Sequence, residues 1–277
     1  MTDLMQSTKQ SGFLSGTTLK LIACISMFID HFGLVVFPKI MIFRIIGRLA
    51  FPIFAYFIAE GCKYTRNRLR HFLLIFSVGV IYFFFYLIAY KQVYPSVFLT
   101  FSISLLNVYL IDEMKKFVFA PKHNIDADGT HRVKFWRLAL AICSVSVALV
   151  LSYIPFRYAK FDYGYIGMLA PVLLALFDFS KIKVPKKLEF LDTGAVRILL
   201  LAIICIALSI RNQNLKFEIF GFVCTVQIFN VLALPLLVFY NGKVGVKKLK
   251  YFFYAFYPVH LGVIMGIKMI IDWCTAK

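Results

Sequence analysis

Ionisable side chains interrupt three apolar runs of this sequence, and they are the first candidates for chemistry. Asp30 and His31 lie in one run, Arg44 and Arg48 in the next, and His260 in the last. A charged side chain in hydrocarbon costs between about 3 and more than 10 kcal/mol, so such residues face a bundle interior and mark functional sites. Imidazole is suited to general-base work, and guanidinium groups bind phosphate or stabilise an oxyanion.

The spacing of these residues predicts that they meet. At a rise of about 1.5 Å per residue, His31, Arg48 and His260 each lie roughly 14–16 Å from a polar end of their run, near the middle of a core about 30 Å thick. We therefore expect one layer, with His31 as base and His260 as the second candidate for base or acid. Asp30 orients a partner other than His31, because adjacent helical side chains point about 100° apart. A lone histidine or an Asp–Arg pair is also compatible with a purely structural role.

A second polar group follows the second run, and it is predicted to bind a phosphorylated donor together with Arg44 and Arg48. Two guanidinium groups facing one carboxylate leave a positive charge over, which invites an anionic ligand. The alternative for the Lys and Arg residues is that they only fix membrane topology. The members of this group are Glu60, Lys63, Tyr64, Thr65, Arg66 and Asn67.

The elements that position these residues are predicted to be membrane helices. Of 277 residues, 61% are hydrophobic, which a water-soluble core of this size could not hide. With about 20 residues per span, we predict an all-α polytopic transmembrane bundle of nine helices, with eight or ten as alternatives. The predicted spans are 19–37, 40–60, 71–90, 95–111, 136–156, 162–179, 195–211, 217–240 and 250–273. Span 162–179 contains Asp162, two glycines and a proline, so it is expected to be broken or tilted.

Lys and Arg concentrate in alternate connections, which predicts a multi-pass plasma-membrane protein with a cytoplasmic N-terminus. Residues 1–18 are predicted to form a cytoplasmic tail, and 19–277 one transmembrane domain. A net charge of +18 would suit nucleic acid, but the basic residues fall in short clusters between apolar runs, so none is expected as a partner. The six cysteines form no CxxC pair or metal-ligand spacing, and no metal is expected.

Four stretches resemble the TraX family, the F-pilin acetylase type of membrane protein from conjugation systems. They are DHFGLVVFP from Asp30, RIIGRLAFPIFAYFIAEGCKYTRN from Arg44, YGYIGML from Tyr163 and YPVHL from Tyr257. The resemblance implies an acyltransferase-3-like bundle that takes an acetyl group from cytosolic acetyl-CoA. The acceptor known for the family is the N-terminal amine of a pilin.

The sequence and the resemblance together predict an integral membrane acetyltransferase. Its expected partners are the lipid bilayer, an acyl-CoA donor and an acceptor protein, peptide or glycan carrying an amine or hydroxyl; a homo-oligomer is left open. Two rivals remain: a transporter or flippase, in which the same buried charges bind a solute or relay protons, and a structural subunit of a conjugation or secretion assembly. Nothing in the residues names the acceptor.

Overall fold

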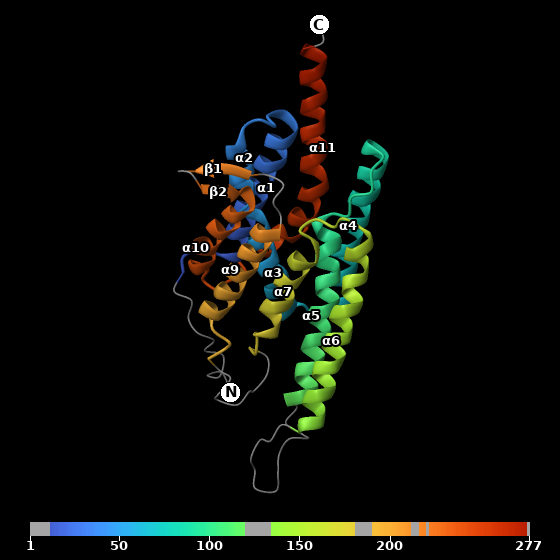
Figure 1. Ribbon diagram of the computed structural model, residues 1–277, viewed down its shortest axis with the longest axis vertical. Helices are drawn as coiled ribbons and strands as arrows, with labels where there is room; N and C mark the ends of the chain where they lie inside the picture. The colour runs from blue at the N-terminus through green and yellow to red at the C-terminus, as the bar shows by residue number, and fades with distance from the viewer. Residues whose placement is uncertain (1–11, 120–133, 181–189, 212–215, 220–221, 276–277) are drawn as a thin grey trace.

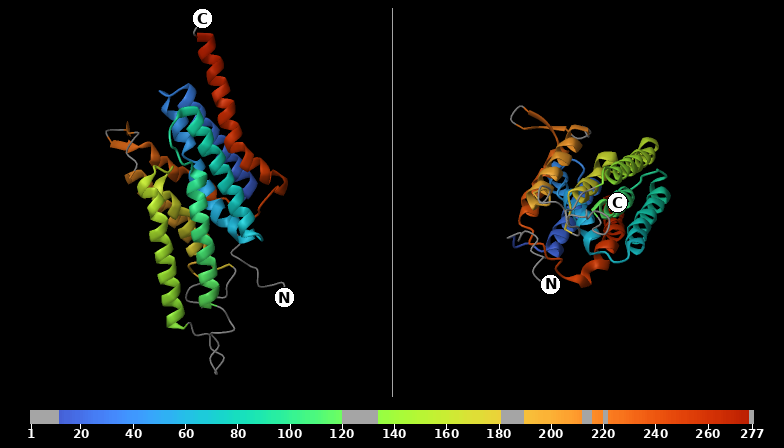
Figure 2. Two further views of the ribbon diagram at one scale, coloured as in Figure 1. Left: turned by 90° about the vertical axis from the view of Figure 1, so that its right-hand side faces the viewer. Right: turned by 90° about the horizontal axis from the view of Figure 1, so that it is seen from below.

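The computed structural model describes residues 12–119, 134–180, 190–211, 216–219 and 222–275. Within them the chain forms a bundle of helices with one small β-hairpin (Figure 1). The helices α5 and α6 reach the lower end of the bundle, and α11 extends beyond the other helices at the upper end (Figures 1 and 2).

The first two predicted spans form a tightly packed hairpin. Helix α1 (Gly16–Val36) begins where the Ser15 side chain accepts a hydrogen bond from the backbone N–H of Thr18, and it ends just before Pro38, whose ring disfavours helix in the preceding residue. The predicted span 40–60 is divided into α2 (Met41–Gly47) and α3 (Ala50–Tyr64). Pro52 lies in the first turn of α3, and its missing N–H leaves the carbonyl four residues earlier without an α-helical donor, which favours a break there.

The remaining long helices follow the predicted spans closely. Seven helices of the described chain are long and apolar enough to cross a membrane. Besides the α1–α3 hairpin they are α4 (Arg68–Tyr90), α5 (Val97–Phe119), α6 (Phe135–Tyr158), α9 (Gly194–Arg211) and α11 (Lys250–Thr275). Helix α5 continues eight residues beyond the predicted end of its span, into the connection expected between 112 and 137.

Two of the nine predicted spans are short or irregular. Span 162–179 contains only the 13-residue helix α7 (Gly164–Leu176), preceded by a left-handed Tyr163, in agreement with a broken helix. Span 217–240 is wrong in its first half, which forms an antiparallel hairpin of β1 (Lys216–Ile219) and β2 (Phe222–Thr225), with Lys216 opposite Thr225. The 3₁₀ helix η2 (Val226–Leu232) and helix α10 (Ala233–Val238) complete it.

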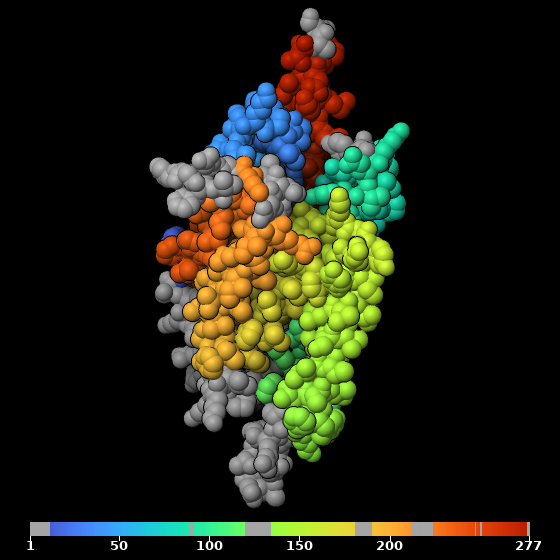
Figure 3. Space-filling view, viewed as in Figure 1, coloured from blue at the N-terminus to red at the C-terminus, as the bar shows by residue number. Residues whose placement is uncertain are grey.

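The core lies where α3, α5 and α7 pack together, with α1 and α9 against them. Helix α6, by contrast, is almost unburied and lies along the outside (Figure 3). Most of its exposed side chains are apolar, including Val147, Val150 and Leu151. A soluble protein rarely exposes such a surface, so this face is suited to lipid.

Candidate functional site

Two glycines bring the α1–α2 hairpin together at the predicted site. A Cβ atom added to Gly47 would lie 2.2 Å from the Cβ of Asp30, and one added to Gly33 would lie 2.2 Å from the Cβ of Phe43. Both distances are far below van der Waals contact, so only glycine permits this approach. The hairpin thereby holds Asp30 directly against the helix that carries Arg44.

His31 and His260 form a direct hydrogen bond between α1 and α11. The Nδ1 atom of His31 lies 2.8 Å from Nε2 of His260, and Nδ1 of His260 lies 2.8 Å from the carbonyl oxygen of Phe256. His260 is 3% exposed, whereas His31 is only partly buried. The contact confirms that the two histidines share one layer.

The hydrogen-bond partners assign the tautomers of the neutral pair. A carbonyl oxygen only accepts, so the proton of His260 is on Nδ1 and its Nε2 is an acceptor. The proton between the rings therefore belongs to Nδ1 of His31. Nε2 of His31 keeps a lone pair, which is the atom a general base needs.

Asp30 pairs with Arg44. It does not pair with His31, as the helical geometry predicted. An Nη1 atom of Arg44 lies 2.8 Å from Oδ2 of Asp30, with both side chains largely buried. Arg48 lies in the turn between α2 and α3 and is 8% exposed. Three buried atoms have no hydrogen-bond partner among the described residues: Asp30 Oδ1, Arg44 Nε and Arg48 Nε. The site therefore has one acceptor and two donors that could bind a ligand or water.

Asp162 and Tyr163 are site residues that the sequence analysis did not select. Both are electrostatic neighbours of Arg48, and the Tyr163 side chain lies within hydrogen-bonding range of it. Asp162 interrupts an apolar run, which is the signal that marked Asp30, but it was interpreted only as a sign of a broken helix. With Asp162 present, Arg44 and Arg48 have two carboxyl groups as electrostatic neighbours, so a positive charge left over is no longer required by the count of charges.

The second predicted group divides into three kinds of residue. Asn67 caps α4 through a 2.9 Å hydrogen bond from the backbone N–H of Arg70, and the Thr65 hydroxyl donates to the carbonyl of Gly61 at 2.8 Å. Both contacts are local and structural. Tyr64 is exposed, with its hydroxyl 3.5 Å from Glu60, and Arg66 is exposed as well.

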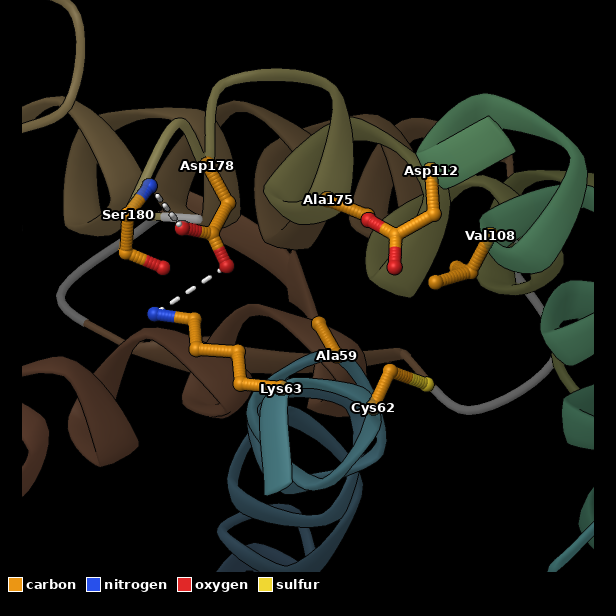
Figure 4. A pocket seen from close by; sticks show the side chains of 8 residues that line it. All are labelled: Ala59, Cys62, Lys63, Val108, Asp112, Ala175, Asp178 and Ser180. Carbon is orange, nitrogen blue, oxygen red and sulfur yellow. Dashed lines mark hydrogen bonds and ion pairs between the residues drawn. The ribbon is translucent and has the colours of Figure 1, made fainter. Parts of the chain in front are cut away.

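Glu60 and Lys63 belong to an ion-pair network between α3, the end of α7 and α9. Lys63 Nζ lies 2.8 Å from Glu60. It also lies 3.2 Å from Asp178, the ion pair drawn in Figure 4. Arg197 lies 2.9 Å from Asp178, 2.6 Å from Asp192 and 3.4 Å from Glu60. A cavity of about 10 Å³, the volume for roughly one water, adjoins this network. Nothing as large as a nucleotide fits there in this conformation.

The charges of this network set the ionisation of Asp178, which lies just beyond α7. Burial alone raises the pKa of a carboxyl group, but Lys63 and Arg197 outweigh it, so the pKa of Asp178 is lowered from its ordinary value. Lys115 adds a third cation by donating to the carbonyl oxygens of Ala175 and Asp178, at 2.6 and 2.7 Å. These contacts cap the C-terminal end of α7.

The two predicted groups lie in different layers of the bundle. Glu60 follows Arg48 by 12 residues along α3, which corresponds to roughly 18 Å at the rise of an α-helix. The layer of His31 and Arg48 is therefore separate from the network of Lys63 and Arg197. A single ligand contacting both would have to extend along most of α3.

Comparison with known proteins assigns the chain to a family. Residues 15–268 match the family described as TraX protein. The chain belongs to the TraX family. All the site residues named above, from Asp30 to His260, lie inside the matched range, so the TraX family domain contains the complete layer.

Two relatives extend the comparison of this TraX family member. A probable fimbrial assembly protein FimC, serogroup H1, of Dichelobacter nodosus is 26% identical over 93% of this chain and 97% of its own length. An uncharacterized protein RP591 of Rickettsia prowazekii is 32% identical over 53% of this chain, and the match spans about half (49%) of that relative. No solved structure gives a significant match.

Proposed function

We propose that this TraX family protein is a membrane acetyltransferase that moves an acetyl group from acetyl-CoA to an amine or hydroxyl acceptor. The observation that carries the proposal is the His31–His260 pair. It leaves an unprotonated imidazole nitrogen inside a membrane bundle, with Arg44 and Arg48 as electrostatic neighbours of His31. A structural role alone needs one hydrogen bond and no cationic neighbours.

The proposed reaction gives one role each to His31, Arg48 and His260. Nε2 of His31 takes the proton of the acceptor as its nitrogen or oxygen attacks the thioester carbonyl carbon. Arg48, which has an N–H without a partner, stabilises the negative charge on the carbonyl oxygen. The carbon–sulfur bond then breaks, the acetyl group stays on the acceptor, and the CoA thiolate leaves and takes up a proton. His260 holds His31 in the tautomer that the first step requires.

The proposed donor enters from the cytoplasm, at the end of the bundle that carries Lys63 and Arg66. A CoA-type donor carries phosphates there, and its thioester end has to reach the His31 layer. Because the cavity beside Lys63 holds about one water, entry requires the network of Lys63 and Arg197 to open. For the acceptor, the name of the Dichelobacter relative, a fimbrial assembly protein, favours the N-terminal amine of a pilin-type subunit over a glycan.

The decisive experiment incubates purified protein in nanodiscs with radiolabelled acetyl-CoA and membranes of the native host. We expect label on a macromolecule, with free CoA released in equal amount, and no label with His31→Ala. A transporter would move a solute without covalent change, and a structural subunit would leave the label on CoA. Either result would refute the acetyltransferase.

A further inference from the structure

Tyr163 has a backbone conformation that a bulky side chain rarely adopts. It connects α6 to α7 with φ of 58° and ψ of −5°, in the left-handed region. Such a conformation costs on the order of 1–3 kcal/mol and persists only where its surroundings enforce it. An outlier of this kind is a reason to look for a function at the residue.

Three neighbouring elements enforce this conformation. The backbone N–H of Asp162 donates to the carbonyl of Pro95 at 3.1 Å, and the Thr100 hydroxyl donates to the carbonyl of Asp162 at 2.9 Å. The Tyr163 ring stacks on Phe51 of α3, with ring centroids 3.9 Å apart. A Cβ on Gly167 would lie 2.4 Å from the Cβ of Tyr163, so the first turn of α7 packs directly against the residue. Tyr163 is therefore held at its backbone and at its ring.

The polar end of this fixed side chain meets Arg48. The two side chains lie within hydrogen-bonding range of each other, and Asp162 is an electrostatic neighbour of both. Arg48 lies outside α2 and α3, in the turn that joins them, and its Nε has no partner among the described residues. The stack of Tyr163 on Phe51, three residues after Arg48, fixes the phenol relative to that same turn.

We propose that Tyr163 is a positioning residue that orients the Arg48 guanidinium group toward the reacting carbonyl through its hydroxyl. This inference rests on the proposed acetyl transfer, in which Arg48 stabilises the developing oxyanion. A positively charged group acts on a transition state only if its direction is set beforehand. A flexible arginine would bind the donor and the transition state about equally well, which lowers KM without raising kcat.

The test compares Tyr163→Phe with the wild type and with Tyr165→Phe. Tyr163→Phe removes only the hydroxyl and keeps the ring stacked on Phe51. Tyr165 is the matched control, because its hydroxyl donates to the carbonyl of Leu149 at 3.1 Å and is not part of the site. We expect Tyr163→Phe to lower kcat about tenfold with KM for acetyl-CoA nearly unchanged, as the loss of one hydrogen bond to a charged group predicts. Tyr165→Phe should match the wild type.

A second experiment uses the variant Arg48→Lys to test whether Tyr163 acts through Arg48. Lysine lacks the planar guanidinium group that the hydroxyl orients, so adding Tyr163→Phe to Arg48→Lys should change kcat less than twofold. A tenfold loss in both backgrounds would show that Tyr163 does not act through Arg48. An unchanged kcat in Tyr163→Phe would refute the positioning role. An inactive wild type would instead refute the acetyltransferase.

A chemical readout tests the contact independently of activity. Phenylglyoxal modifies arginine side chains, and mass spectrometry of the peptide that contains Arg48 measures the rate. Losing the hydroxyl partner should make Arg48 react faster in Tyr163→Phe than in the wild type or Tyr165→Phe. Equal rates in all three proteins would show that the hydroxyl does not hold the guanidinium group.

Discussion

Nδ1 of His31 lies 2.8 Å from Nε2 of His260, and this one contact joins the first and last helices across 229 residues of sequence. Because His260 also donates to Phe256, it can only accept the proton of His31. The pair thus has a direction: His260 accepts from Nδ1 of His31, and Nε2 of His31 is left with a lone pair for the proposed base role. The two histidines are not interchangeable, and their variants should differ.

His31→Ala should lower kcat by at least about 10²-fold, since a positioned general base contributes 10²–10⁴. His260→Leu should lower it roughly tenfold, the effect of one lost hydrogen bond. His260→Gln should recover part of the loss, because the amide oxygen accepts from His31 Nδ1. Folding in detergent should stay near normal, as a hydrogen bond between membrane helices is worth only about 0.6–2 kcal/mol. A larger loss in His260→Leu than in His31→Ala would make His260 the base.

Gly47→Ala should destabilise the protein by about 1–3 kcal/mol, because its Cβ would overlap Asp30 and force α1 and α2 apart. Activity should also fall in the protein that remains folded, since the Asp30–Arg44 ion pair depends on the close packing of α1 against α2. The matched control is Gly262→Ala on α11, where an added Cβ meets nothing within 4 Å. Thermal unfolding in detergent measures both variants. Equal melting temperatures would show that the hairpin adapts to the extra methyl group.

The layer of His31, Arg48 and His260 could be predicted because charge in an apolar run is rare and helical rise is regular. The same rule applied to Asp162 would have found it, but the glycines and proline nearby pointed to backbone irregularity instead. Apart from the C-terminal end of α5, which lies eight residues beyond the predicted end, the ends of the long helices followed from proline and polar residues to within a few positions. These signals are local, so one sequence contains them.

Two features depend on contacts between distant segments, which local patterns in a single sequence do not reveal. The strands β1 and β2 fall in a segment predicted as helix from residue 217, because a short apolar run has no periodicity that separates strand from helix. The network of Glu60, Lys63 and Arg197 depends on how α3 and α9 pack, and Arg197 was counted only as a basic residue of a connection. Their chemistry became visible only when distant segments were placed together.

Arg197→Ala should destabilise the protein by about 3–5 kcal/mol, because it leaves three carboxylates close together in a poorly solvated site. Arg197→Lys should be milder. Because the folded protein lowers the pKa of Asp178, its ionised carboxylate stabilises the fold. This stabilisation is fully present above the unfolded-state pKa of about 4, and it is lost as the pH falls through the lower pKa of the folded state. Melting temperature should therefore fall steeply below about pH 4 in the wild type, and less steeply in Asp178→Asn. Parallel curves for the two proteins would contradict this role.

Orientation can be tested with an impermeant thiol reagent on intact cells. Cys274 is exposed near the end of α11 and is predicted to be outside, so the native protein should already be labelled. In a Cys274→Ser background, cysteine at Gln92 should be labelled and cysteine at Asn67 should be shielded until the cells are opened. The alternation of basic connections is the physical reason. Labelling of the Asn67 cysteine from outside would show that the predicted orientation is reversed, and it would contradict a donor that binds from the cytosol.

Arg66 is the basic residue of the 63–70 cluster best placed to bind a donor phosphate. Lys63 is engaged by Glu60 and Asp178, and Arg68 by Asp112 and Glu113. Arg66 is exposed, and it forms no hydrogen bond or ion pair with another described residue. Its guanidinium group is therefore free for a ligand.

Arg66→Ala should raise the KM for acetyl-CoA several-fold and change kcat little, because contacts far from the reacting carbonyl persist in the transition state. Arg48→Ala should instead lower kcat. Added salt should imitate the Arg66 variant, since exposed charges are screened over about 8–10 Å near physiological ionic strength. Arg157→Ala, an exposed arginine at the other end of the bundle, is the matched control and should leave both constants unchanged. If Arg66 only fixed topology, its variant would show a normal KM and less inserted protein, so quantifying the inserted fraction beside KM decides between the two roles.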